Sequence, residues 1–558
     1  MRGLLSALGG AVFLFAASPS ALAAPPLTVP INGCAGATVT GAIGTYPGSD
    51  AAGEMRMFLG IPYAAPPLVA NRWMPPQPVP CWTGDKMMNF FGKSCPQGPT
   101  LDPWESEDCL TLNVFTNKSG TVARQPVMVF IHGGGLAAGM GTGREYNPYP
   151  LVQEGVVVVT INYRLGALGF LAANALGYKT GNFGILDQQA ALKWVKKNIV
   201  RFGGDPANVT IFGQSAGGLS VLLQLVSPNS LTNGLFHKAI IESGAFYERA
   251  TTLNEARAKG AAFVQSLGCG NIACLRTKAV GAILSKQNPV GQNPPLGQSV
   301  ALVTQDNIIL KNTIQKLLEA GQFKKVPTIV GSTHDETRFH IAGNTRIGTG
   351  TTCNFTSNIT PGNYQMSLQN TGASQQMASQ VAMAYPAGNS PKTANIAFAQ
   401  QSTDANYACR TLRTNRWMAL KGGINFAYEF NDANAPHYLW SPFKLSDNST
   451  FPYGAYHGAE LPYLFRHGTK DGCGANIPAM TGPQKQLAAK MVTYWTTFAK
   501  TGNPNPVPAV PGLQNWPEFT ATATGNFISF MGRTPKLLKA SAFDTIHKCT
   551  SFWDGKAP

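Results

Sequence analysis

The chain has 558 residues, 44% of them hydrophobic, so a sizeable core is available. Its formal net charge of +16 comes from 43 Lys and Arg against 27 Asp and Glu, and only 13% of residues are charged. No run of five Lys or Arg and no aromatic-basic motif occurs, which argues against a nucleic-acid partner and favours a basic surface on a secreted protein.

The first residues have the features of a secretory signal peptide. Arg2 supplies the positive charge, Leu4–Ala17 is mostly apolar, and Ala21-Leu22-Ala23 fits an A-x-A cleavage site. The apolar run is too short to span a bilayer comfortably, and no later stretch is long and apolar enough. We expect a signal peptide over 1–23, a single domain over 24–558, no integral membrane segment after cleavage, and a secreted or periplasmic location.

Short apolar runs alternate with helical patterns along the rest of the chain. Helices are expected at Leu186–Phe202, which ends before Gly203, and at Lys485–Lys500, which ends before Gly502. Strands alternating with helices predict an α/β fold with a mainly parallel sheet covered on both faces. Catalytic residues then belong on loops at the carboxyl ends of the strands. The predicted strands are Val127–Ile131, Val156–Ile161, Val209–Phe212, Lys238–Glu242, Val326–Gly331 and Ile424–Phe430.

Two motifs follow predicted strands and indicate acyl-transfer chemistry. Gly213–Gly217 fits G-x-S-x-G, a turn that exposes the Ser215 hydroxyl between a strand and a helix and aims the N–H of Ala216 at the reacting carbonyl. His132–Gly135 reads HGGG, the oxyanion-binding pattern of esterases and lipases. A serine nucleophile also needs a base to take its proton and an acid to orient that base.

Further blocks make the chain similar to the type-B carboxylesterases, the family that includes cholinesterases, mammalian carboxylesterases and some fungal lipases. The similarity covers nearly the whole chain after the signal peptide and implies an α/β-hydrolase fold with a mainly parallel central sheet flanked by helices. The matching blocks are Phe58–Ala64, Glu107–Val114, Asn162–Gly166, Gly181–Gln188, Phe202–Pro206, Gly331–Glu336 and Tyr456–Leu461.

The resemblance implies that Glu336 is the acid and His457 the base, in the chain order Ser215, Glu336, His457. Thr337 stands where the family usually has glycine, so Asp335 remains an alternative acid. The N–H groups of Gly134, Gly135 and Ala216 would bind the oxyanion. Other histidines near these blocks are His334, His340 and His467, and each is expected to be a surface or packing residue.

The family pattern also gives structural roles to charged and polar residues. Arg72 would pair with Glu107, and Arg164 with Asp187, because buried charges need partners. Ser243 occupies a position that supports the histidine in relatives, although a simple strand-end serine is an equal interpretation.

The ten cysteines behind a signal peptide indicate disulfides in an oxidising compartment. The resemblance implies Cys95–Cys109, around a loop that borders the gorge in relatives, and Cys269–Cys274. The other six cysteines allow 15 pairings, of which we favour Cys34–Cys81, Cys409–Cys549 and Cys353–Cys473. No C-x-x-C and no zinc-like Cys/His spacing occurs, so neither a metal nor a cofactor is predicted.

The sequence therefore predicts a serine carboxylic-ester hydrolase acting through an acyl-enzyme on a small-molecule or lipid ester. Gln214 stands where many relatives have glutamate, which disfavours a cationic choline ester. Trp104 either lines the gorge or packs the disulfide loop. An interfacial lipase for longer-chain acylglycerols and a non-catalytic adhesion protein are the alternatives. Acyl length, alcohol and oligomeric state stay open.

Overall fold

The computed structural model describes residues 27–47, 54–98, 101–117, 124–177, 181–245, 250–287, 303–344, 357–438, 444–470 and 475–556. The predicted signal peptide, Cys353 and Cys473 lie outside these residues. No helix in the described ranges is long and apolar enough to cross a membrane.

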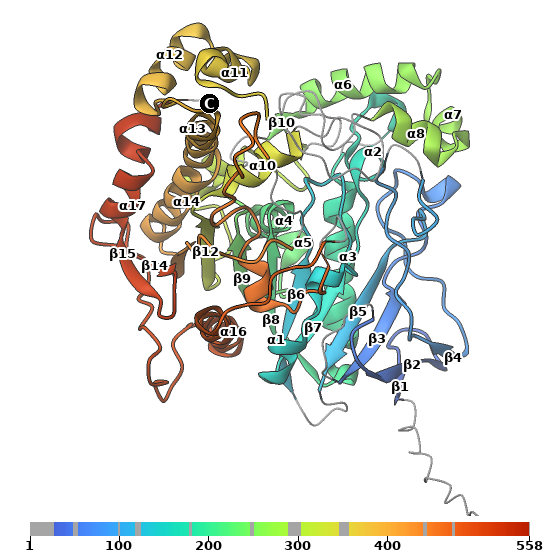
Figure 1. The fold of residues 1–558 in the computed structure, drawn as a ribbon. Coiled ribbons are helices and arrows are strands. Elements are labelled where there is room, and N and C mark those ends of the chain that lie inside the picture. Colours follow the sequence, from blue (N-terminus) through green and yellow to red (C-terminus); the bar gives the residue numbers. More distant parts are fainter. Residues whose placement is uncertain are drawn as a thin grey trace, which may run out of the picture.

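A large twisted sheet runs through the molecule, from the N-terminal strands in blue to the C-terminal strands in red (Figure 1). Among the described residues it has thirteen strands. The seven strands from β7 to β14 are parallel, whereas β1, β2, β3, β5 and β15 pair in antiparallel fashion at the two ends. The order is β1 (Leu27–Pro30), β2 (Ala37–Gly44), β3 (Met55–Pro62), β5 (Thr111–Thr116), β7 (Val157–Ile161), β6 (Gln125–Ile131), β8 (Gly204–Gln214), β9 (Lys238–Glu242), β12 (Thr328–Thr333), β13 (Asn425–Phe430), β14 (Asn526–Phe530) and β15 (Lys536–Lys539), with β4 (Gly84–Met87) beside β2.

The mainly parallel sheet predicted from the sequence is confirmed, and each of the six predicted strands is present. Successive residues of a strand point to opposite faces, so a strand covered on both faces must be apolar throughout. In β6, Met128 and Phe130 enter one core, while Val127, Val129 and Ile131 enter the other. This explains why the central strands read as unbroken apolar runs.

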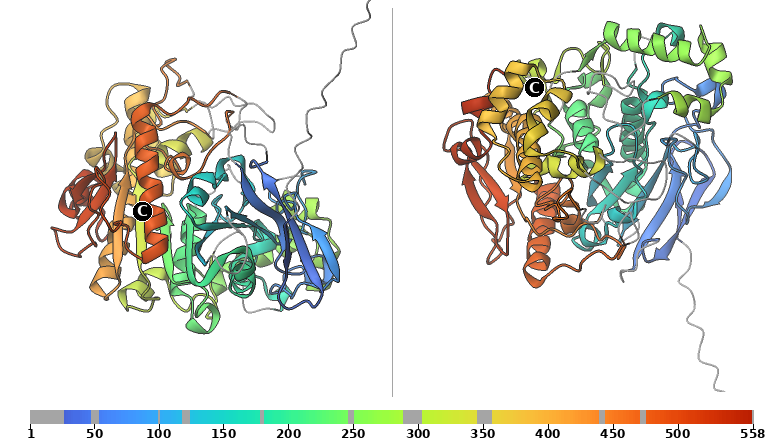
Figure 2. Two further views of the ribbon diagram at one scale, coloured as in Figure 1. Left: turned by 90° about the horizontal axis from the view of Figure 1, so that it is seen from below. Right: turned by 45° about the horizontal axis from the view of Figure 1, so that its top comes forward.

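Helices cover both faces of the sheet (Figure 1; Figure 2). On one face α16 packs through Leu487, Met491 and Trp495, and on the other face lie α3, α4 and α9. The helices are α1 (Tyr149–Gln153), α2 (Gly166–Phe170), α3 (Phe183–Asn198), α4 (Ala216–Val226), α5 (Asn229–Thr232), α6 (Leu253–Ser266), α7 (Ile272–Thr277), α8 (Val280–Lys286), α9 (Ile314–Glu319), α10 (Glu336–Asn344), α11 (Tyr364–Asn370), α12 (Gln375–Ala384), α13 (Pro391–Thr403), α14 (Cys409–Leu420), α15 (Leu461–Leu464), α16 (Gly482–Thr501) and α17 (Ala540–Ile546).

The two helices predicted from periodicity are present, with small changes at their ends. Helix α3 begins at Phe183 and continues through a 3₁₀ turn, and Gly203 ends that turn in the left-handed region with φ of 85°. Helix α16 begins with a capping box formed by Thr481 and Gln484. Gly502, with φ of 83°, ends it in the same way.

Two buried ion pairs, Arg72 with Glu107 and Arg164 with Asp187, connect loops beside the sheet. Both pairs were implied by the family resemblance. Arg72 Nε and Nη2 each donate to Glu107 over 2.6 Å. Arg164 makes two 2.7 Å bonds to Asp187, whose side chain is fully buried. Because both pairs are bidentate, each fixes the orientation of its loop as well as neutralising the charge.

Replacing Asp187 should destabilise the protein strongly. Asp187→Asn leaves the Arg164 guanidinium buried without an anion, which costs about 3–5 kcal/mol of unfolding free energy. Asp554→Asn is the control, because Asp554 is 42% exposed and lies 3.6 Å from Arg413, where a pair contributes about 0–1 kcal/mol. Thermal and denaturant unfolding would measure both. Equal stability of the two variants would contradict the assignment.

A second buried charge network ties the C-terminal segment to the sheet. His547 lies between Asp404, 2.6 Å from its Nδ1, and Glu429 on β13, 2.8 Å from its Nε2. Burial alone would lower the pKa of His547, but the two carboxylates raise it to about 10. The imidazole is therefore held as a buried cation.

This network should make stability fall as pH rises. In the unfolded chain a histidine has a pKa of about 6.5, so between about pH 6.5 and 10 only the folded state keeps the His547 proton. The unfolding free energy should drop by up to about 1.4 kcal/mol per pH unit in that window. His547→Gln should remove this part of the slope, whereas His467→Gln should retain it. Unchanged slopes in His547→Gln would count against the buried imidazolium.

Candidate active site

Ser215 lies at the turn from β8 into α4. Its backbone has φ of 59° and ψ of −127°, a sparsely populated conformation that costs about 1–3 kcal/mol. The Ser215 N–H donates to the Glu242 carbonyl at 2.8 Å, which anchors the turn to β9. A side chain at Gly217 would overlap the Ile131 carbonyl at the end of β6. The elbow therefore needs glycine to approach the neighbouring strand.

The HGGG loop leaves β6 beside this elbow. Gly134 and Gly135 have φ of 107° and 65°, which glycine adopts without strain. None of the described residues accepts a hydrogen bond from the N–H groups of Gly134, Gly135 or Ala216. These groups are therefore available to bind an oxyanion.

His132 holds the start of the loop rather than reacting. Its ring stacks on Tyr163 with centroids 4.4 Å apart, and Tyr163 donates its hydroxyl to the His132 carbonyl at 2.9 Å. Burial lowers the pKa of His132 to about 4, so the imidazole is neutral near pH 7. Its Nδ1 lies 2.8 Å from the Gly133 carbonyl.

The structure brings Glu336 and His457 into direct contact. Glu336 Oε2 lies 2.5 Å from His457 Nδ1, and Glu336 Oε1 accepts the Thr333 N–H at 2.8 Å. Both side chains are buried. The other ring nitrogen of His457, Nε2, lies 3.4 Å from the side-chain amide nitrogen of Gln214, the residue before Ser215. The imidazole thus bridges Glu336, in the segment after β12, and Gln214, at the end of β8.

Asp335, the alternative acid, is engaged elsewhere. Its carboxylate accepts the Ala455 N–H at 2.9 Å, pairs with Arg338 at 2.9 Å and contacts His334 at 3.2 Å. Burial alone would raise the pKa of Asp335, but His334 and Arg338 lower it below its usual value. The geometry therefore favours Glu336 as the partner of His457.

The remaining histidines near the sequence motifs do not bond to Ser215 or Glu336. His334 faces Asp335, and His467 Nδ1 contacts the Gly468 carbonyl at 2.8 Å. His340 Nε2 lies 2.9 Å from the Tyr407 hydroxyl, and its ring centroid is 5.1 Å from that of His457. His340 therefore lies in a packing position beside the His457 ring.

Two buried acids lie behind the elbow. Glu242 accepts the Trp495 indole N–H at 2.7 Å, and burial raises its pKa to about 7. Burial also raises the pKa of Glu460 well above its ordinary value. Ser243 is buried, and its hydroxyl makes no hydrogen bond to the described residues. Neither glutamate was selected from the sequence as a candidate site residue. A single glutamate has no characteristic spacing to a partner residue that would set it apart from other glutamates.

The described cysteines are joined in four bridges, Cys34–Cys81, Cys95–Cys109, Cys269–Cys274 and Cys409–Cys549. The Cys95–Cys109 loop contacts the oxyanion loop through Gln97, which exchanges two hydrogen bonds with Gly139 at 2.8 and 3.1 Å. Trp104 on the same loop is 76% exposed, with Lys93 Nζ 4.9 Å from its ring centroid. It therefore does not pack the loop.

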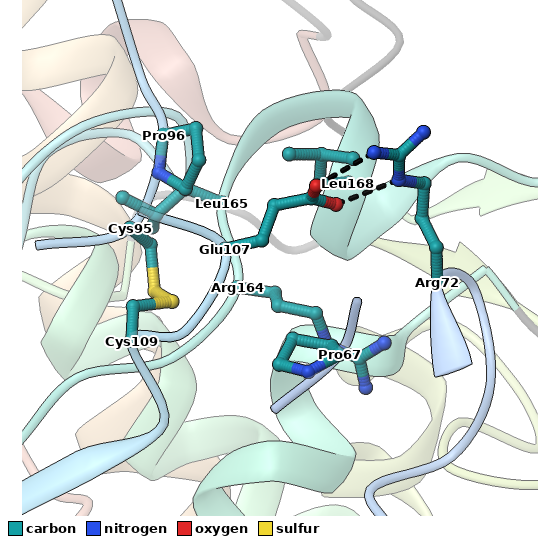
Figure 3. Close-up of a pocket in the computed structure, with 9 residues that line it drawn as sticks. All are labelled: Pro67, Arg72, Cys95, Pro96, Glu107, Cys109, Arg164, Leu165 and Leu168. Carbon is teal, nitrogen blue, oxygen red and sulfur yellow. Dashed lines mark hydrogen bonds and ion pairs between the residues drawn. A yellow bond between two sulfur atoms is a disulfide. The ribbon is translucent and has the colours of Figure 1, made fainter. Parts of the chain in front are cut away.

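A pocket adjoins this bridge (Figure 3). Its walls include Cys95, Cys109, the Arg72–Glu107 pair and Leu168. None of Ser215, Glu336 and His457 lines it, so we regard it as part of the structural support for the loop.

One group of described side chains has the spacing of a metal site. The ligand atoms of His334, Glu429 and His547 lie within 4.8 Å of one another. Both nitrogens of His547 already contact carboxylates, so a metal ion would have to displace the Glu429 contact. The arrangement fits an ion-pair network better than a metal centre.

A model of the Carboxylesterase family matches residues 28–543. The chain is 34% identical to human cocaine esterase over 83% of its length and 82% of that protein. It is 34% identical to para-nitrobenzyl esterase of Bacillus subtilis (82% and 88%) and 32% identical to fumonisin B1 esterase of Sphingopyxis macrogoltabida (84% and 82%).

The match spans the parallel sheet, the elbow and the loops that carry Glu336 and His457. Together with the α/β-hydrolase architecture, it shows that the chain belongs to the carboxylesterase family and is a carboxylic ester hydrolase.

Proposed function

We propose that Ser215, His457 and Glu336 form the catalytic triad of a secreted serine esterase. The observation that carries this proposal is the 2.5 Å contact between Glu336 and His457, with the other ring nitrogen directed to the residue next to Ser215. An imidazole whose Nδ1 proton is held by a carboxylate presents Nε2 as a base. The strained turn that exposes the Ser215 hydroxyl is consistent with a nucleophile.

The reaction proceeds through an acyl-enzyme. Ser215 Oγ attacks the ester carbonyl while His457 takes its proton, and the oxyanion accepts hydrogen bonds from Gly134, Gly135 and Ala216. The C–O bond to the alcohol then breaks, and His457 returns the proton to the leaving oxygen. Water, activated by the same imidazole, cleaves the acyl-enzyme and releases the acid.

The substrate is a small-molecule ester. The names of the three relatives describe esterases for cocaine, para-nitrobenzyl esters and fumonisin B1, so the family name does not fix one alcohol. Gln214 beside the imidazole carries no charge, which removes an attraction for a cationic alcohol. The domain extends over 24–558, and cleavage after Ala23 delivers it to an oxidising compartment in which the disulfides are stable.

Replacing the nucleophile should abolish turnover without unfolding the protein. Ser215→Ala should lower kcat by a factor on the order of 10⁵–10⁶ on a short-chain nitrophenyl ester, because acylation is lost. An organophosphate should label one serine of the wild type, and peptide mapping should locate it at 215. Near-normal turnover in Ser215→Ala would refute the triad. Emulsified long-chain triglyceride, assayed in parallel, separates this esterase from the alternative of an interfacial lipase.

A matched pair of acid variants completes this test. Glu336→Gln should lower kcat by about 10⁴-fold, because the imidazole loses the carboxylate that orients it. Asp335→Asn should change kcat by less than about tenfold and should chiefly reduce stability, because Asp335 holds Arg338 and the Ala455 N–H. The opposite ranking would make Asp335 the acid.

Removing the Cys95–Cys109 bridge should impair catalysis as well as stability. Closing a loop with a separation of 14 residues is worth about 3 kcal/mol in the chain-entropy model. The double Ala variant should also raise KM or lower kcat, because Gln97 connects the loop to Gly139. The control is the double Ala variant of Cys269 and Cys274. The bridge between these two residues closes only a short loop at the start of α7. Unchanged kinetics in the Cys95 and Cys109 variant would show that the loop does not support the oxyanion site.

A further inference from the structure

A group of lysines lies at the edge of the sheet opposite the candidate active site. Lys324 and Lys325 precede β12, Lys421 precedes β13, and Lys196 lies in the last turn of α3. Because β9, β12 and β13 are parallel, their amino ends share one edge, whereas the site lies at the carboxyl ends. We call these four lysines the basic face.

Short contacts hold the four ammonium groups in two neighbouring pairs. In the segment before β9, Lys324 Nζ donates to the Asn229 side chain at 3.1 Å, and a Cβ at Gly234 would come within 2.9 Å of Lys196 Nζ. In the second pair, Lys325 Nζ donates to the carbonyl oxygen of Lys421. The cations therefore belong to loops that lie against one another at this edge.

The charge of the basic face is not neutralised within the molecule. In the ranges that the structure describes, none of the four lysines forms an ion pair with a carboxylate. The nearby acids bond to neutral donors instead: Asp205 accepts the Ala207 N–H at 2.9 Å, and Glu319 accepts the Gln315 amide at 2.9 Å. Much of the formal charge of +16 is thus left unpaired here.

The effect of this crowding is visible on the groups around it. Burial lowers the pKa of Lys325, and the neighbouring Lys421 lowers it further. Burial likewise lowers the pKa of His237, which three lysines around it lower further. Like charges therefore repel one another at this edge, and an anionic partner would relieve the repulsion.

Exposed aliphatic side chains stand beside the second pair of lysines. Leu420 is 68% exposed and Ile424 is 48% exposed, on either side of Lys421 in the chain. Lys325 Nζ lies 3.8 Å from the ring centroid of Phe323, whose edge would be 3.2 Å from a Cβ at Gly423. Lysine can lay its aliphatic stem along apolar groups while its charge stays in the polar layer. This part of the basic face is therefore amphipathic.

We propose that the basic face docks the enzyme on a membrane surface rich in anionic phospholipid, with Leu420 and Ile424 entering the headgroup layer. Its cations come from separate loops and are all lysines, which act as point charges and suit a diffuse anionic surface better than one defined anion. The exposed aliphatic groups would gain from contact with lipid and not from contact with a hydrated polymer.

Docking through this edge would leave the catalytic edge open to solution. Strand β12, whose six residues span about 20 Å, separates the lysines that precede it from Glu336, which follows it. The bound enzyme should therefore keep its activity on soluble esters. The proposal does not depend on the triad, so Ser215→Ala should bind vesicles as the wild type does.

Cosedimentation of the purified protein with vesicles tests the docking. Vesicles of phosphatidylcholine containing phosphatidylglycerol should bind the protein at low salt and release it at about 0.5 M salt, because exposed charges are then screened. Vesicles of phosphatidylcholine alone should not bind it. Equal binding to both kinds of vesicle, or to neither, would overturn the proposal.

Two double variants locate the surface. Lys325→Gln with Lys421→Gln should weaken vesicle binding by about five- to thirtyfold, because each lysine near an anionic surface contributes about fivefold. Leu420→Ser with Ile424→Ser should also weaken vesicle binding but should leave binding to soluble polyphosphate unchanged. If the serine variant binds vesicles as the wild type does, the partner is a soluble polyanion and the membrane proposal is wrong.

Lys286→Gln with Lys392→Gln is the matched control. Both lysines are exposed, on α8 and α13 beyond the carboxyl edge of the sheet, toward the top of Figure 1. This variant has the same change in net charge and should keep vesicle binding within about twofold of the wild type. Equal losses in the two lysine variants would assign the binding to net charge alone and overturn the basic face. Unfolding midpoints, measured for every variant, identify any loss of binding that comes from misfolding.

Discussion

The close approach of the elbow to strand β6 is the constraint on which the site depends. Gly217 lies against the Ile131 carbonyl, where no larger residue fits, and the Ser215 N–H is bonded to the Glu242 carbonyl of β9. Strand β8 lies between β6 and β9, so its final residue is held from both sides. The sheet thereby maintains a backbone conformation at Ser215 that would relax in an isolated turn.

The other groups of the site meet there because the parallel strands share one edge. The oxyanion loop leaves β6 at Ile131, the elbow leaves β8 at Gln214, and the acid loop leaves β12 at Thr333. The buried ion pair of Arg164 with Asp187 lies just past the carboxyl end of β7, at the same edge, and fixes the loop there. Precise placement of the reacting atoms is thus a property of the whole sheet and not of one loop.

Most of the fold could be predicted because the central strands are buried on both faces. That burial requires unbroken apolar runs such as Val127–Ile131, and the glycines that end α3 and α16 gave clear stops. Strand β4, which pairs with β2 in parallel, was not predicted, because all four of its residues are exposed and give no apolar signal. It depends on pairing with β2, which lies much earlier in the sequence.

For the candidate site, motifs identified the three residues of the proposed triad but not the groups that surround them. Ser215, Glu336 and His457 stand in patterns whose spacing reflects a turn, whereas Tyr407 lies in a π-helical turn about 70 residues from the acid. No local pattern predicts that Tyr407 contacts His340, because the contact arises from the packing of α10 against α13 and the following turn. The same holds for the bond between Trp495 and Glu242, which joins α16 to β9.

Burial disfavours the charged form of several groups in this part of the molecule. Burial lowers the pKa values of His132 and His340 and so keeps both imidazoles neutral. Gln214, beside His457, carries an amide where many relatives carry an acid. Burial also raises the pKa values of Glu242 and Glu460 and so opposes their ionisation. Among the residues that the structure describes, Glu336 is the carboxylate in direct contact with the ring. In the proposed mechanism His457 takes the proton from Ser215, and the new cation then faces the Glu336 carboxylate in a weakly screened environment, where attraction is strong. Additional fixed charges would hold the imidazole in one protonation state, whereas this arrangement lets it gain and return a proton in each turnover.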